Sequence, residues 1–181
     1  MALLDDTLSQ EEVRERFTYN PKTGEFFHKH RPRSMFSSDR DWKKWNTRYE
    51  GNLAGARSYY GYWRIIINRR HYMAHRIAWL WVHGEWPPED IDHINGDRTD
   101  NRISNLRLAT RSQNIMNSKR RRTNRSGVKG VRWIPARRKW RAEVGLEGDS
   151  HYIGEFDDLR AAEAAVMAAR GELHGEFCRH E

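Results

Sequence analysis

A short strand-like segment that ends in Asn95-Gly96 constrains the fold of this chain more than any other feature. Asn-Gly is a strong signal for a two-residue hairpin, because a type I′ turn needs positive φ at both central positions. The turn places residues 91–94 on one arm, and the return arm lies near residues 105–108, after a loop over 97–104. Thr110 can then cap a helix. The sequence therefore predicts a β-hairpin followed by a helix.

Polar side chains in this unit form a candidate catalytic site. The end of the first strand faces the first turns of the helix, so Asp92 and Asn114 are expected to converge on one ion. One carboxylate and one amide oxygen, completed by water and phosphate oxygens, suit Mg²⁺ better than zinc. His93 is the candidate general base, because imidazole titrates near neutral pH. The pattern indicates hydrolysis of a phosphodiester with Mg²⁺, or with Mn²⁺ as an alternative.

A plain hairpin and a calcium loop are the alternatives to a catalytic site in this segment. On the dipeptides alone, a hairpin with a polar approach strand is the preferred interpretation of Asp92-His93 and Asn95-Gly96. A calcium loop that begins at Asp92 fails, because Ile94 and Ile103 would occupy positions 3 and 12, where oxygen ligands are required. For His75 we expect a structural role, since it opens a buried helix and can hydrogen-bond inward.

The same residues resemble the HNH nuclease family, which has the ββα-metal fold. The resemblance covers roughly residues 60–118 and rests on Asp92-His93-Ile94-Asn95-Gly96, Asn105-Leu106-Arg107 and Asn114. Upstream, Ala74-His75-Arg76-Ile77-Ala78-Trp79 resembles the subgroup of phage-encoded HNH homing endonucleases. The resemblance implies that Asp92 and Asn114 are metal ligands, that His93 is the general base and that Asn105 pins the loop carrying the base. As in that subgroup, the third motif position is Asn rather than His.

Charge is distributed very unevenly along the chain. The chain has 33 Lys and Arg, 25 Asp and Glu and a net charge of +8; residues 101–142 hold 14 basic and no acidic residues, so the remainder nets −6. Such a block is typical of proteins that bind polyanions. A solvated charge run is the alternative.

The single cysteine, Cys178, excludes a disulfide within one chain, and no apolar stretch is long enough to span a membrane. We therefore expect a cytoplasmic protein, in a bacterial host cell if it is phage-encoded.

Several elements are expected before the candidate site. Ser9-Gln10-Glu11-Glu12 resembles a capping box that opens a helix through about Arg16. Residues 25–28 and 62–67 have strand composition, and residues 68–70 turn the second strand toward 71–73. Met73, Ile77, Leu80 and Trp81 then predict an amphipathic helix that ends at Gly84. Residues 29–50 are expected to be irregular.

The last segment predicts a three-stranded antiparallel sheet packed on one helix. Residues 129–133, 139–146 and 150–156 have strand composition, and residues 157–173 form an Ala-rich amphipathic pattern. The segment resembles the apetala-type, or plant ethylene-response-factor, DNA-binding domain, which implies that the sheet enters the major groove. Motifs that carry this resemblance include Gly130-Val131-Arg132-Trp133, Trp140-Arg141-Ala142-Glu143-Val144 and Tyr152-Ile153-Gly154-Glu155-Phe156.

Two groups of residues are expected to contact DNA. If Trp140, Ala142 and Val144 face the helix, Arg141 and Glu143 face outward, where Arg can bond guanine and Glu can accept from cytosine. The resemblance adds Arg132 and Tyr152, with Lys129 beside them, whereas Gly145 departs from the family, so the plant target cannot be transferred. The connector residues expected to contact phosphates or to follow a groove are Lys119, Arg120, Arg121, Arg122 and Arg125. Arg107 and Arg111 are also expected to bind DNA. A flexible tether is the alternative for the connector.

The sequence thus predicts an α+β protein: a ββα-metal HNH nuclease module plus a C-terminal three-stranded sheet on one helix. The expected division is an N-terminal region over 1–58, a nuclease domain over 59–118, a basic linker over 119–126 and a DNA-binding domain over 127–181. We expect a site-directed, monomeric endonuclease that nicks duplex DNA, with no membrane or small-molecule partner; two cuts would require a dimer or successive nicks. A non-catalytic DNA-binding regulator with a degenerate nuclease fold is the alternative.

Overall fold

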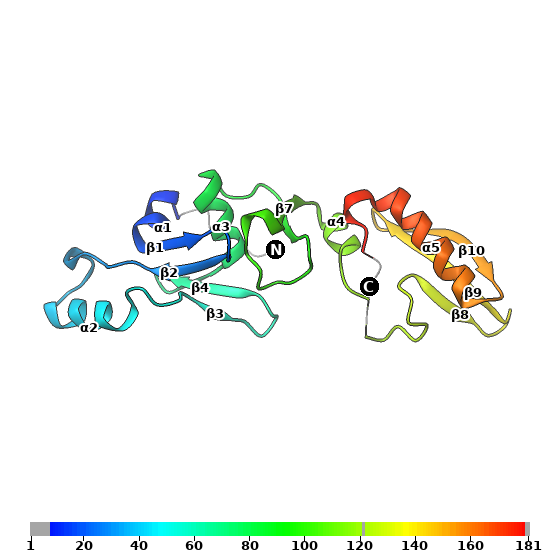
Figure 1. Ribbon diagram of the computed structural model, residues 1–181, viewed down its shortest axis with the longest axis horizontal. Coiled ribbons are helices and arrows are strands. Elements are labelled where there is room, and N and C mark those ends of the chain that lie inside the picture. The colour runs from blue at the N-terminus through cyan, green and yellow to red at the C-terminus, as the bar shows by residue number, and fades with distance from the viewer. Residues whose placement is uncertain (1–7, 121, 180–181) are drawn as a thin grey trace. The chain divides into compact units, whose positions relative to one another are not determined.

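The computed structural model describes residues 8–120 and 122–179, which fall into two compact units (Figure 1). Unit 1 is residues 1–108 and unit 2 is residues 109–181. Both combine helices with small antiparallel sheets, so the predicted α+β class is confirmed. The division into four functional segments stays a prediction. None of the helices that the structure describes is long and apolar enough to cross a membrane.

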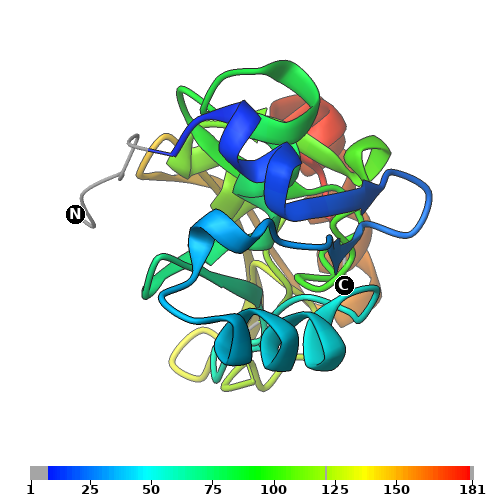
Figure 2. The same ribbon diagram turned by 90° about the vertical axis from the view of Figure 1, so that its left-hand side faces the viewer.

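Unit 1 begins with a helix and a hairpin. Helix α1 (Gln10–Arg16) is opened by the predicted capping box: the Glu12 N–H donates to Ser9 Oγ at 3.1 Å, and the Ser9 N–H donates to Glu12 Oε2 at 2.9 Å. Strands β1 (Phe17–Asn20) and β2 (Glu25–His28) pair antiparallel. Helix α1 packs against α3 (Ala74–His83) (Figure 2). The short N-terminal helix therefore obtains its stability from tertiary packing.

The segment over residues 29–50 was predicted to be irregular, and this was wrong. It contains a 3₁₀ helix (Arg33–Met35) and helix α2 (Asp39–Tyr49), whose N-cap Ser38 accepts a hydrogen bond from the Asp41 N–H. Trp42 Nε1 donates to the Arg31 carbonyl at 2.8 Å. Both views in Figures 1 and 2 show α2 apart from α1 and α3. The helix was missed because its sequence is mostly polar, although Trp42, Trp45 and Tyr49 recur at the i, i+3 and i+7 spacing of one helix face.

A second sheet precedes α3. Strands β3 (Ala56–Arg57), β4 (Trp63–Ile67) and β5 (Arg70–Met73) form it in that order, all antiparallel. Asn68 and Arg69 join β4 to β5 with φ of 50° and 64°, the positive values that a two-residue type I′ turn needs. Helix α3 ends at Gly84, which is left-handed with φ 86°, as predicted.

The predicted hairpin around Asn95-Gly96 exists, but its turn differs. Strands β6 (Asp90–His93) and β7 (Leu106–Ala109) form a two-stranded sheet, and a 3₁₀ helix (Ile103–Asn105) precedes β7. Gly96 has φ 67°, and its N–H donates to the His93 carbonyl at 2.7 Å. Asn95 is not among the residues with positive φ, so the type I′ prediction was wrong. The Asn95 side chain instead bonds within the loop, and this holds the backbone in another conformation.

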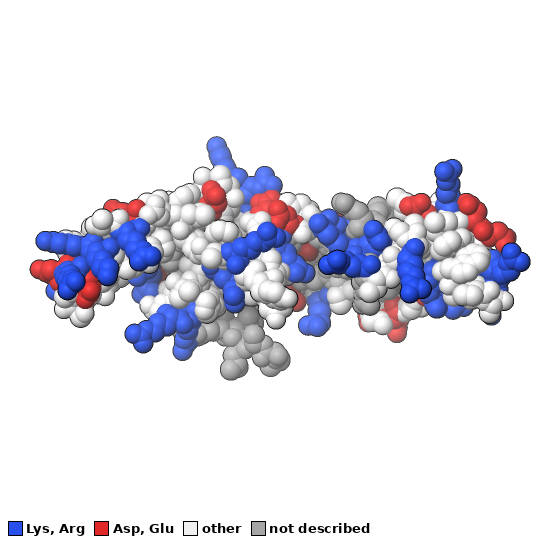
Figure 3. All heavy atoms as spheres, turned by 90° about the horizontal axis from the view of Figure 1, so that it is seen from below, with Lys and Arg blue, Asp and Glu red and all other residues white. Residues whose placement is uncertain are grey.

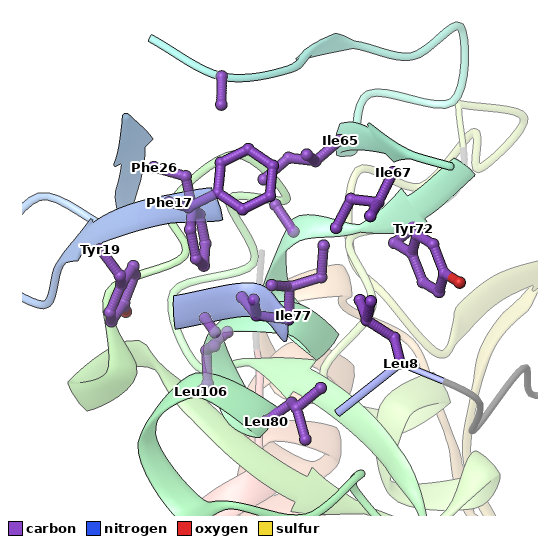
Figure 4. Close-up of a cluster of buried hydrophobic side chains, with 14 of the residues drawn as sticks. Leu8, Phe17, Tyr19, Phe26, Ile65, Ile67, Tyr72, Ile77, Leu80 and Leu106 are labelled. Atoms are coloured by element: carbon purple, nitrogen blue, oxygen red, sulfur yellow. The ribbon is translucent and has the colours of Figure 1, made fainter. Parts of the chain in front are cut away.

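One hydrophobic core holds unit 1 together (Figure 4). The rings of Phe17 and Phe26 meet edge to face at 6.3 Å. The core draws on both ends of the unit but not on the described segment 29–50, and its larger residues are Leu8, Val13, Phe17, Tyr19, Phe26, Ile65, Ile67, Tyr72, Ile77, Leu80, Ile91 and Leu106. The N-terminal hairpin and the strand that carries the candidate site are therefore parts of one packed body.

Unit 2 contains the predicted sheet and helix. Strands β8 (Val131–Ile134), β9 (Lys139–Leu146) and β10 (Asp149–Phe156) lie in the order β10-β9-β8, and α5 (Leu159–His174) packs on them. The first strand begins two residues later than predicted. The helix also begins later, because Asp158 caps it by accepting from the Ala161 N–H. Their shared core is small and is formed by Val128, Val131, Ala142, Val144, Ala162 and Val166.

Unit 2 also contains the predicted short helix after β7. Helix α4 (Arg111–Met116) begins with a capping box between Thr110 and Gln113. Its Met116 packs with Ala109 and with Phe177 of the final 3₁₀ helix (Gly175–Phe177). Asn114 lies on α4 and is thus described with unit 2.

Candidate active site

Asp92 lies on β6 and is nearly buried, with 5% of its surface exposed. The guanidinium of Arg107, on the neighbouring strand β7, donates from Nε to Asp92 Oδ2 at 2.9 Å, and its second nitrogen lies at the same distance. The ion pair offsets part of the desolvation cost of burying the carboxylate. Arg107 was predicted to contact DNA; in the structure its guanidinium bonds to the predicted metal ligand, and the DNA contact stays a prediction.

His93 follows Asp92 and is equally buried. Its Nε2 lies 3.2 Å from Oδ1 of Asn101, and Asn101 Nδ2 donates to the Thr99 carbonyl at 3.1 Å. Because the second bond orients the amide, its oxygen faces the imidazole. The neutral His93 ring therefore carries its proton on Nε2, and Nδ1 is the basic nitrogen.

Two aromatic residues surround the imidazole of His93. The ring of His75, at the start of α3, meets it edge to face with centroids 5.0 Å apart, and the ring of Tyr62 lies 6.1 Å away. Among the described residues, Nδ1 of His75 has no hydrogen-bond partner. His75 is buried at the start of α3, as expected, and its structural role stays a prediction.

Burial determines the protonation of both histidines. It lowers the pKa of His93, against the Asn101 hydrogen bond and the nearby Asp92, Asp100 and Asp97, which raise it. Burial first, and then the nearby His93 and Arg76, lower the pKa of His75 to about 3. Both rings are therefore neutral at neutral pH, so His93 can accept a proton.

The loop between β6 and β7 is held by side-chain amides. Asn105 Oδ1 accepts from the Asn95 N–H at 3.0 Å, and Asn105 Nδ2 donates to Asn95 Oδ1 at 3.0 Å and to the Asp100 carbonyl at 2.8 Å. The Asn105 carbonyl also accepts from the Ile94 N–H at 2.9 Å. Asn105 thus bonds to the residues that follow His93, and this geometry suits the pinning role that the resemblance implies.

The sequence did not indicate Asn101, although only 2% of its surface is exposed beside His93. Its carbonyl accepts from the Tyr19 hydroxyl on β1 at 2.7 Å. Burial raises the pKa of Tyr19 to about 12, so the hydroxyl stays a donor. The N-terminal hairpin therefore supports the loop that contacts the candidate base. No local pattern could have revealed this, because the two residues are 82 positions apart.

A divalent metal has two predicted protein ligands, the Asp92 carboxylate and the Asn114 amide. Within the described part of the chain, no group of three or more His, Cys, Asp or Glu residues could hold a metal ion. The two ligands supply oxygen atoms only, which fit Mg²⁺ or Mn²⁺. Asn114 is partly buried on α4.

The outer face of the sheet in unit 2 carries most of the residues predicted to read bases. Arg132 pairs with Arg141 across the strands, and Glu143 pairs with Tyr152, so these four share one face, opposite Ala142 and Val144. Glu143 lies 3.4 Å from Arg132 and 3.6 Å from Arg141, and the Arg141 guanidinium lies over the Tyr152 ring at 5.2 Å. The predicted alternation is confirmed, and the contact with DNA stays a prediction.

Lys129 is engaged elsewhere. Its Nζ donates to the carbonyls of Met116 and Ser118 at 2.7 and 2.6 Å, and burial lowers its pKa to about 8. Of the connector residues predicted to contact phosphates, Lys119, Arg120, Arg122 and Arg125 are exposed, and Arg121 lies outside the described residues. Arg111, on α4, is exposed as well. Figure 3 shows basic side chains over much of the visible surface, with smaller numbers of acidic side chains interspersed among them.

Comparisons with known proteins match the same region. A family model described as HNH endonuclease matches residues 72–116. Protein 3.8 of Escherichia phage T7 is 40% identical over 89 residues, which are 49% of this chain and 73% of that protein. An uncharacterized HNH endonuclease of Acanthamoeba polyphaga mimivirus is 34% identical over 105 residues, 57% of this chain and 54% of the relative. No solved structure matches significantly.

The match includes every residue of the candidate set: Asp92, His93, Asn105 and Asn114. The predicted resemblance to HNH nucleases is confirmed for this domain, and both relatives are viral proteins. The resemblance of residues 127–181 to apetala-type domains stays a prediction. The chain belongs to the HNH endonuclease family.

Proposed function

We propose that this chain is a homing endonuclease that nicks one strand of duplex DNA in the cytoplasm of a bacterial host. One observation carries the proposal: Asp92 and His93 are adjacent and buried on β6, and the Asn105 side chain bonds to the loop that follows them. A carboxylate and a neutral imidazole are thus held side by side in a protein of a nuclease family.

His93 acts as the general base in this proposal. Its Nδ1 accepts a proton from the attacking water while Nε2–H donates to Asn101 Oδ1. The water oxygen attacks phosphorus, the bond from phosphorus to the 3′ oxygen breaks, and that oxygen takes up a proton. The products are a 3′-hydroxyl and a 5′-phosphate.

Asp92 and Asn114 would hold one Mg²⁺ or Mn²⁺, which stabilises negative charge on the phosphate and the leaving oxygen when bound. The Arg107 guanidinium also pairs with the Asp92 carboxylate and adds positive charge beside the proposed metal ligand. One site per chain supports a nick by a monomer. The outer face of the unit 2 sheet selects the DNA by base contacts, and the exposed basic connector adds affinity by phosphate contacts.

Nicking of a supercoiled plasmid tests the proposal. The plasmid carries the DNA that flanks the coding sequence of this chain and is incubated with Mg²⁺ or with EDTA. Wild type should produce open circles only with Mg²⁺, and His93→Ala should nick at least about 100-fold more slowly, since general-base catalysis contributes about 10²–10⁴-fold. His83→Ala, which removes an exposed histidine at the end of α3, is the matched control and should nick normally.

A second outcome would reject the nuclease activity. If wild type leaves the plasmid intact with Mg²⁺ while wild type and His93→Ala both retard a labelled duplex, the chain is a non-catalytic DNA-binding protein.

A further inference from the structure

The turn between β3 and β4 exposes two tyrosines that the proposed function does not use. Tyr59 is 96% exposed and Tyr60 is 71% exposed, more than any other large hydrophobic residue that the structure describes. Their rings contact each other edge to face, with centroids 5.5 Å apart. Two adjacent aromatic rings held in water by a folded sheet indicate an interaction surface, because aromatic side chains contribute strongly to binding.

The backbone that carries these rings is already ordered. The Gly61 N–H donates to the Ser58 carbonyl at 2.9 Å, and the Ser58 N–H donates to the Tyr62 carbonyl at 2.7 Å. Gly61 has φ 84°, which glycine adopts without strain. Because the turn is closed before a partner binds, little conformational entropy is lost on binding.

The turn is also attached to the candidate active site. Arg98, on the loop that follows His93, donates from Nη1 to the Tyr60 carbonyl at 3.0 Å. Its guanidinium lies over the ring of Tyr62 at 4.7 Å, and that ring lies 6.1 Å from the His93 ring. The two exposed tyrosines are therefore placed next to the loop of the candidate base.

Charge identifies the kind of partner. Residues 51–84, which include the whole β3-β4-β5 sheet, contain no Asp or Glu and five arginines: Arg57, Arg64, Arg69, Arg70 and Arg76. Tyr59 and Tyr60 therefore project from a sheet that carries arginines and no acidic residues. Such a surface is complementary to a polyanion whose aromatic groups are accessible for stacking. Nucleic acid has both properties.

We propose that Tyr59 and Tyr60 form a wedge that inserts against a base step of duplex DNA beside the phosphate to be cleaved. Apolar wedges of this kind partly unstack the step, unwind it and bend the duplex. Here the bend would present the strand to the candidate base. The inference rests on the proposed function in taking duplex DNA as the partner and in placing the wedge beside the phosphate to be cleaved.

DNA unwinding tests the wedge without cleavage. A relaxed circular plasmid is incubated with the non-cleaving His93→Ala chain and a type I topoisomerase, and the protein is then removed. Insertion should leave negatively supercoiled topoisomers. The His93→Ala/Tyr59→Ala/Tyr60→Ala chain should leave none at equal plasmid occupancy. The control His93→Ala/Met167→Ala/Leu173→Ala, which removes two exposed apolar side chains from α5, should retain the shift.

Conservative and active variants complete the test. Tyr59→Phe/Tyr60→Phe should keep the unwinding, and Tyr59→Ala/Tyr60→Ala in the otherwise wild-type chain should nick at least tenfold more slowly with an unchanged melting temperature. Equal topoisomer shifts with and without the tyrosines, or no shift with His93→Ala, would overturn the wedge. A tyrosine-dependent shift from a chain that never nicks would support the wedge and reject the proposed nuclease.

Discussion

At the scale of single residues, the imidazole of His93 owes its position to neighbours from three separate segments. Asn101 bonds to its Nε2, and the rings of His75 and Tyr62 pack against it. The Asn101 amide determines which nitrogen of the ring carries the proton, and the rings of His75 and Tyr62 restrict tilting of the imidazole. A candidate base held in this way does not have to reorganise before it accepts a proton.

We predict that His75 makes the folded protein sensitive to acid. Its pKa is about 3 in the folded protein, below the ordinary value of 6.5 that applies after unfolding. Between these values the unfolded chain binds a proton that the folded chain does not bind, so the free energy of unfolding falls as the pH falls. His75→Phe should reduce this slope by up to about 1.4 kcal/mol per pH unit.

Urea unfolding of wild type and His75→Phe from pH 8 to pH 4 measures the effect. The two curves should run parallel above pH 7 and diverge below pH 6. Parallel curves over the whole range would show that His75 titrates alike in the folded and unfolded chains.

At the scale of elements, the N-terminal hairpin supports the β6–β7 loop. The turn between β1 and β2 approaches that loop so closely that a Cβ on Gly24 would lie 2.5 Å from the carbonyl carbon of Asn101. Tyr19, on the same hairpin, bonds to the Asn101 carbonyl. Two contacts from one hairpin therefore fix the residue that orients the candidate base.

We predict that Gly24→Ala impairs both stability and nicking. Gly24 has φ 77°, and Gly51, with φ 73°, is the matched control because nothing lies within 4 Å of its Cβ position. Gly51→Ala should lose only about 1–2 kcal/mol from left-handed backbone strain. Gly24→Ala has the same strain, and it must also displace the loop. Its nicking rate should fall by about tenfold or more, since small misplacements at a reacting centre are costly.

Thermal unfolding and plasmid nicking of the two variants separate these effects. Equal melting temperatures and equal nicking rates for Gly24→Ala and Gly51→Ala would contradict the supporting role of the hairpin.

At the scale of the whole molecule, the basic block spans the end of unit 1 and much of unit 2. Within it, the described connector residues Lys119, Arg120, Arg122 and Arg125 are exposed, whereas Arg107 is paired with Asp92. The positive charges therefore divide into those available to phosphates and those used inside the protein.

We predict that the connector determines how strongly DNA binding depends on salt. In the variant Lys119→Ala/Arg120→Ala/Arg122→Ala/Arg125→Ala, the slope of log affinity against log salt should become shallower by about 0.9 for each residue that contacts a phosphate. The charge-preserving variant Arg120→Lys/Arg122→Lys/Arg125→Lys should keep the slope. Binding of a labelled duplex between 50 and 300 mM salt, roughly the range over which such contacts weaken, measures it. A slope unaffected by the alanines would mean that the connector only tethers.

Local sequence determined much of this protein. The Ser9 and Thr110 capping boxes, the helix stop at Gly84 and the strands of unit 2 follow from neighbouring residues, because caps, turns and alternation are short-range effects. The adjacent Asp92 and His93 and the spacing to Asn105 and Asn114 likewise pointed to the family that the comparisons support.

Only the tertiary structure decided which residues surround the candidate base. Tyr19, Tyr62 and His75 are far from Asn101 and His93 in the chain, and only packing of the shared core brings them to one place. The conformation of Asn95 was likewise decided by its bonds to Asn105 and Asp100 rather than by its dipeptide. Contacts between distant residues depend on how the whole core packs, and no pattern in the neighbouring sequence carries that information.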